Sequence, residues 1–74
     1  MTPIAEKAMA LSRPYLGPAT ESFLSRQCKS HLKTELAAVT QPQMKELAKW
    51  VEVGAGLIMD PVKAAELGKK IAAL

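Results

Sequence analysis

The chain has 74 residues, which is enough for one domain near the lower limit at which a single hydrophobic core sustains a fold. Nearly half of the residues are apolar (49%), but few are aromatic, and carving a deep enzyme cavity from so small a core would be costly. The net charge of +3 arises wholly in residues 1–33 and is too small to indicate an anionic partner by itself. These features favour one interaction domain, spanning residues 1–74, over an enzyme.

The sequence contains no feature typical of a secreted or membrane-spanning protein. The single cysteine, Cys28, excludes an internal disulfide, so nothing marks an oxidising compartment. The N-terminal segment carries charges at Glu6 and Lys7, where a secretory signal would be apolar. No apolar run approaches the roughly 18–20 residues of a membrane span. We therefore expect a cytoplasmic protein without a membrane partner.

Prolines close behind capping residues divide the first half of the chain into two predicted helices. Thr2 and Pro3 open a helix over residues 3–12, and Pro14 is expected to end it. Pro18 opens a second helix over residues 18–33. The apolar positions of the two helices recur at helical spacing: Ile4, Ala8 and Leu11 in the first, and Ala19, Phe23, Leu24, Cys28 and Leu32 in the second.

The second half of the chain predicts two more helices, joined to the first pair by residues 34–39. Thr40 and Gln43 form a capping box that opens a helix over residues 41–58. Gly54 and Gly56 either let a neighbouring helix approach closely, which we expect, or end that helix. Asp60 and Pro61 open a final helix over residues 61–73. No segment alternates as a strand does, so the predicted fold is all-α, a compact bundle of four short helices.

The third predicted helix has an unusually wide apolar arc. One stripe is sufficient to face the core: Met44, Leu47, Ala48, Val51, Ala55 and Ile58. A second set, Trp50, Val53 and Leu57, lies round the side of the same helix. Either different neighbouring helices cover the two sides, or the second set remains exposed as a surface for a partner or a second copy.

The second helix carries polar residues whose side chains could take part in chemistry. Cys28 and His31 share a face, but zinc needs about four such ligands and the chain has no other His or Cys. A Cys–His nucleophilic pair would also need an orienting group and an oxyanion site. We therefore expect no catalytic residue, metal or cofactor, and a buried structural thiol at Cys28. Gln27 and His31 fall inside the apolar arc, so they pair with each other, pair with the backbone of a linker, or face a partner.

A basic stripe runs along the opposite face of the second helix. Arg26, Lys29 and Lys33 could contact phosphates, with Ser22 and Ser25 alongside. Base-reading side chains in a known docking motif, and aromatic residues interleaved for single strands, are both missing. A solvated face is the simpler interpretation, and an anion-contact surface is the alternative.

The connection between the first two helices contains the motif Tyr15-Leu16-Gly17-Pro18-Ala19, in which Gly17 is expected to adopt a backbone conformation that other residues disfavour. Together with Phe23, Leu24 and Arg26 this stretch resembles a small bacterial helical module with a Tyr-aliphatic-Gly-Pro-Ala motif. Such modules are appended to serine/threonine kinases and other signalling proteins. The resemblance implies a regulatory or interaction role without catalytic residues.

The sequence therefore predicts a non-catalytic protein-interaction or regulatory module, which binds a protein partner or a second copy. The alternative is a small nucleic-acid-binding protein that uses the basic stripe on the second helix.

Overall fold

The computed structural model describes residues 1–74, and every regular element in it is helical. Helix α1 (Pro3–Leu16) begins as predicted, because the Thr2 hydroxyl accepts a hydrogen bond from the Ala5 N–H at 3.2 Å. It ends at Leu16, so the predicted end at residue 12 is wrong. Pro14 lies inside the helix. A proline in the last turn lacks an N–H donor and its ring crowds the carbonyl of residue 10, but Leu11, Tyr15 and Leu16 pack against the core and hold this turn in place.

Gly17 ends α1 in the conformation expected from the motif. Its φ of +57° and ψ of −134° lie where L-residues are rarely found, and its N–H bonds to the Arg13 carbonyl. The chain then enters the short 3₁₀ turn η1 (Gly17–Ala19), where Pro18 needs no N–H partner. Thr20 closes this turn by donating its hydroxyl hydrogen to the Gly17 carbonyl at 2.6 Å.

The second predicted helix is not one regular α-helix. After η1 it consists of α2 (Thr20–Gln27) and a π-helical turn, η2 (Cys28–Leu32). Lys33 ends it in the left-handed region, with a φ of +57°. A π turn widens the helix and rotates the side chains beyond it, so residues 28–33 do not continue the α-helical face that the sequence predicts.

The linker between the two halves is held tightly. It contains the 3₁₀ turn η3 (Leu36–Ala38), and its residues Leu36 and Val39 are buried in the core. Thr2 fastens it to the start of α1: its N–H donates to the Ala37 carbonyl at 3.0 Å and its hydroxyl donates to the Val39 carbonyl at 2.8 Å. The linker is therefore a structural part of the core.

The capping box forms as predicted, since the Gln43 side-chain oxygen accepts from the Thr40 N–H at 2.9 Å. It opens the 3₁₀ turn η4 (Gln41–Gln43), from which helix α3 (Met44–Ala55) continues. The predicted end at residue 58 is wrong, because residues 56–59 form turns beyond the helix. Asp60 caps helix α4 (Pro61–Ala72) as predicted, accepting from the Val62 N–H at 2.8 Å.

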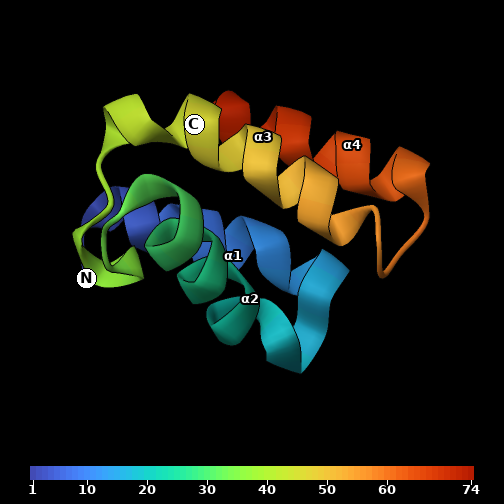
Figure 1. The fold of residues 1–74 in the computed structure, drawn as a ribbon, viewed down its shortest axis with the longest axis horizontal. Helices are drawn as coiled ribbons and strands as arrows, with labels where there is room; N and C mark the ends of the chain where they lie inside the picture. Colours follow the sequence, from blue (N-terminus) through green and yellow to red (C-terminus); the bar gives the residue numbers. More distant parts are fainter.

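Helices α3 and α4 lie side by side and cover α1 and α2 (Figure 1). Gly68 of α4 permits the close approach, since a Cβ there would lie 3.3 Å from the Ala48 carbonyl oxygen of α3. The molecule measures 29 × 22 × 21 Å. Helix α1 contributes small residues and Met9 to the core, and the rest of the chain contributes the fully buried large side chains: Leu24, Val39, Met44, Leu47, Val51, Leu67 and Ile71. The all-helical prediction is confirmed, whereas the division into four regular helices is not.

Candidate functional site

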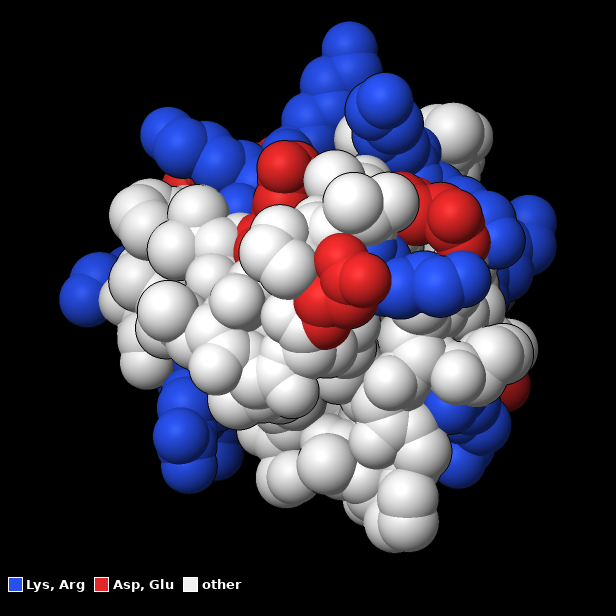
Figure 2. All heavy atoms as spheres, turned by 90° about the vertical axis from the view of Figure 1, so that its right-hand side faces the viewer, with Lys and Arg blue, Asp and Glu red and all other residues white.

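Two charge-free segments meet at one end of the molecule. Residues 14–20 comprise the last residues of α1, the turn η1 and the first residue of α2, and residues 53–59 form the end of α3 and the turn after it. They lie together, since Ala19 lines a hollow with Leu57 and Tyr15 lines another with Met59. Figure 2 faces this end and shows uncharged atoms over most of its lower and left-hand part. We call residues 14–20 and 53–59 the uncharged end.

The most exposed large apolar side chains in this region belong to residues 53–59. Leu57 is 84% exposed, Ile58 65% and Val53 56%. Val53 and Leu57 are members of the predicted partner surface, and no neighbouring helix covers them. Ile58 was expected in the core, which is wrong, because α3 ends at Ala55 and the turn carries Ile58 outward. Leu57 and Ile58 line the same hollow, and adjoining exposed apolar side chains are a feature of contact surfaces.

Trp50, the third member of the predicted surface, is only half-buried. One face of its indole stacks on the His31 ring, with centroids 3.8 Å apart and planes inclined by 5°. The Lys49 ammonium lies 5.4 Å from the Trp50 ring centroid. No hydrogen bond joins Gln27 to His31, so the first of the three alternatives for these residues, pairing with each other, does not occur. The sequence places His31 on the apolar arc of the second predicted helix and Trp50 on that of the third. It does not show that the two rings face each other.

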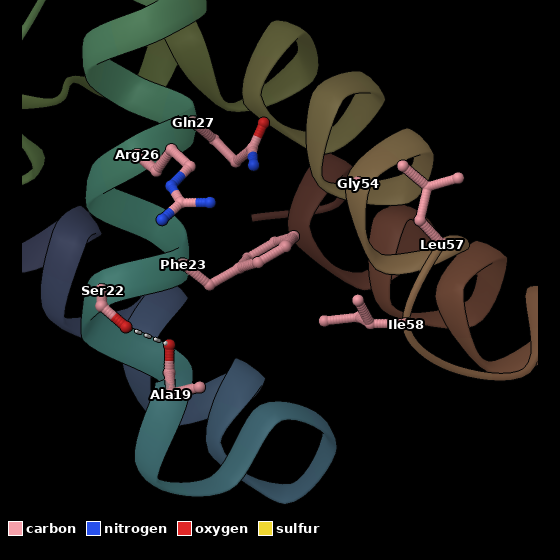
Figure 3. A pocket seen from close by; sticks show the side chains of 8 residues that line it. All are labelled: Ala19, Ser22, Phe23, Arg26, Gln27, Gly54, Leu57 and Ile58. Atoms are coloured by element: carbon pink, nitrogen blue, oxygen red, sulfur yellow. Dashed lines mark hydrogen bonds between the residues drawn. The ribbon is translucent and has the colours of Figure 1, made fainter.

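A hollow of about 370 Å³ lies between α2 and α3 at the uncharged end (Figure 3). Phe23 and Gln27 reach it from α2, and Leu57 and Ile58 reach it from the turn after α3. Gly54 forms its floor, since a Cβ there would lie 3.0 Å from Phe23 Cζ and 3.2 Å from Gln27 Nε2. The expected close approach at Gly54 is confirmed, and Gly56 instead follows the last residue of α3. We call this cavity the α2–α3 hollow.

The predicted basic stripe is divided among different surroundings. Arg26 lines the α2–α3 hollow. Lys29 lies in the π turn and forms an exposed ion pair with Glu35 at 3.7 Å. Lys33 lies beyond the helix in the left-handed region. The structure therefore brings Arg26 together with Leu57, which the sequence placed on a different candidate surface. Lys29 and Lys33 lie in and beyond the π turn, so they do not continue the α-helical face that carries Arg26.

The Tyr15 ring joins α1 to α4. Its hydroxyl donates a hydrogen bond to Glu66, and the Lys70 ammonium lies 5.2 Å from the ring centroid. The hydrogen bond from Tyr15, helped by the Lys63 and Lys70 charges, lowers the pKa of the Glu66 carboxyl. The contacts with Tyr15, and the charge of Glu66, raise the pKa of Lys70. In this structure, therefore, the motif residues Tyr15, Gly17 and Pro18 set a turn and fasten it to α4.

The only cysteine lies where its thiol is unreactive. Cys28 is completely buried, as expected, and burial raises the pKa of its thiol, which keeps it protonated. No group of three or more His, Cys, Asp or Glu side chains gathers in a way that could hold a metal ion. None of the helices combines the length and the apolar character needed to cross a membrane.

Comparison of the chain with family models, with curated proteins and with solved structures finds no match. Its function is therefore inferred from its own exposed surfaces and side-chain chemistry.

Proposed function

We propose that this chain is a non-catalytic protein-interaction or regulatory module, a compact bundle of four short helices that binds a protein partner through the uncharged end. The observation that carries the proposal is the exposure of Leu57, Ile58 and Val53 within a segment, residues 53–59, that has no charged side chain. Fully burying one such side chain contributes about 1.5–3 kcal/mol. A domain this small has few large apolar groups, and three left in water are most simply explained by burial against another protein.

The surroundings of the reactive groups support a non-catalytic role. The Cys28 thiol is buried, and the His31 ring stacks on Trp50 instead of approaching a nucleophile. The resemblance of the motif around Gly17 to accessory modules of bacterial signalling proteins supports a regulatory role. We place this activity in the cytoplasm, in keeping with a chain that has a single, buried cysteine.

Nucleic-acid binding by Arg26, Lys29 and Lys33 receives less support. Glu35 already pairs with Lys29, and an exposed acidic partner would repel phosphates. Three dispersed cations would contact few phosphates, whereas non-specific binding depends on many.

A position-specific crosslinking experiment tests the interaction surface. A photoreactive phenylalanine analogue is introduced at Leu57 in one chain and at Val62 in another, and each is irradiated in a cell extract. Val62 is a matched control, because it is 72% exposed and apolar but does not line the α2–α3 hollow. We expect discrete crosslinked proteins from position 57 and few from position 62. Equal, diffuse crosslinking from both positions would contradict the proposal.

A further inference from the structure

The charges around the α2–α3 hollow have one sign. Of the residues that line it, Arg26 alone is charged, and no acidic side chain is among them. The two ion pairs of the chain involve other residues, Lys29 with Glu35 and Lys70 with Glu66, so the Arg26 guanidinium has no carboxylate partner. A guanidinium offers five N–H donors in a planar fork that suits a carboxylate. The edge of the hollow is therefore complementary to an acidic group.

The interior of the hollow is complementary to an apolar side chain. The half-buried Phe23 ring forms one wall and Ile58 faces it, while the exposed Leu57 lies at the rim (Figure 3). Gly54 between them keeps the floor low enough for the ring to lie against the backbone of α3. The Gln27 amide lies at the same floor and makes no hydrogen bond within the chain, so it can bond to a ligand.

Symmetry disfavours a second copy as the occupant. A two-fold dimer built on this hollow would bring two Arg26 guanidinium groups into one interface, and the lining residues include no carboxylate to pair with either of them. Like charges brought together in this way oppose association. The fold also has no strand edge to which an extended peptide could add. A hollow between two helices suits a helical segment, which presents apolar residues three or four positions apart.

We propose that the α2–α3 hollow binds an acidic amphipathic segment of a partner protein. An apolar side chain of that segment enters between Phe23 and Leu57, and a neighbouring Asp or Glu carboxylate pairs with Arg26. The inference rests on the proposed function and specifies the chemistry of the partner at the same end of the molecule.

Peptide selection tests the proposal without knowledge of the natural partner. Random 12-residue peptides displayed on phage are selected on the wild-type chain and depleted on the Leu57→Ser variant. We expect enriched peptides with apolar residues three or four positions apart and Asp or Glu beside them. A synthetic enriched peptide should bind Arg26→Gln about tenfold more weakly, the usual effect of losing one charge-assisted hydrogen bond. Replacing its Glu by Gln should have the same effect and add little in the Arg26→Gln background.

Matched controls and alternative outcomes separate the two proposals. Lys33→Gln removes an exposed cation outside the hollow and should leave peptide affinity unchanged. Peptides that require Leu57 but not Arg26 would overturn the acidic partner and leave the interaction surface standing. If no selected peptide requires Leu57, both proposals fail. A concentration-dependent dimer that Leu57→Ser dissociates would assign the hollow to a second copy and overturn this inference. Circular dichroism should show that all three variants remain folded, because the substituted side chains are exposed.

Discussion

The His31 and Trp50 rings are stacked, with centroids 3.8 Å apart and planes inclined by 5°. This contact joins the π turn η2 to helix α3. Aromatic pairs of this kind contribute about 0.5–1.5 kcal/mol beyond the area that they bury. We expect His31→Ala to lower the free energy of unfolding by an amount in this range.

A double-mutant cycle measured by chemical denaturation isolates the stack from other effects of the substitution. In a Trp50→Leu background His31→Ala should cost little, because the ring has lost its partner. Equal costs in the two backgrounds would show that the stack contributes no coupling energy.

The effect of a substitution at Gly17 should depend on the chirality of the new residue and not on the size of its side chain. Nothing lies within 4 Å of a Cβ built on Gly17, but its φ is +57°. We expect Gly17→Ala to lower the free energy of unfolding by about 1–2 kcal/mol through backbone strain. A synthetic chain with D-Ala at position 17 should be at least as stable as the wild type, because a D-residue favours this conformation. Thermal melting of the two chains makes the comparison, and equal destabilisation by both enantiomers would point to steric conflict instead.

Ser12 should be a destabilising residue. Its side chain is fully buried on α1, and its hydroxyl oxygen has no hydrogen-bond partner. An unpaired buried polar group costs about 1–3 kcal/mol. Ser12→Ala should therefore raise the free energy of unfolding by roughly 1 kcal/mol, helped by the better helix propensity of alanine. Ser25→Ala, at a partly exposed position of α2, is the control and should change stability less. A loss of stability in Ser12→Ala would reveal a partner for the hydroxyl.

Cys28 should react slowly with thiol reagents in the native state. The thiol is completely buried, and burial raises its pKa, so little thiolate is present at neutral pH. Alkylation followed by mass spectrometry should be slow for the folded chain and fast after denaturation. Native labelling at the denatured rate would show that the helix around Cys28 opens readily.

The Tyr15–Glu66 contact should be visible in an acid titration. Because Tyr15 lowers the folded-state pKa of Glu66, the contact stabilises the fold at neutral pH. That contribution disappears as the pH falls through the carboxyl range, roughly pH 5 to 3. We expect Tyr15→Phe to raise the pKa of Glu66, as followed by NMR of its side-chain carboxyl. The stability difference between wild type and variant should narrow on acidification, and a Glu66 pKa unchanged in the variant would contradict the contact.

Local signals sufficed for the starts of α1, of the turn before α3 and of α4, whereas α2 begins at Thr20 and not at the predicted residue 18. The caps at Thr2, Thr40 and Asp60 were all predicted from residues at most three positions away, because each satisfies N–H groups within its own first turn. The backbone of Gly17 followed from a similarly local preference. The burial of Cys28 followed from helical periodicity, which is also a short-range property.

Where helices end and which apolar residues stay exposed depended on contacts between distant segments. Pro14 stays helical because the last turn of α1 packs on the core, and α3 stops before Ile58 despite an apolar pattern that continues. The sequence placed Val53 and Leu57 on one arc of a helix. Their exposure was decided by where α2 and α4 lie relative to that arc. The meeting of Arg26 with Leu57 in one hollow was likewise decided by tertiary packing, because residues so far apart in the chain share no local signal.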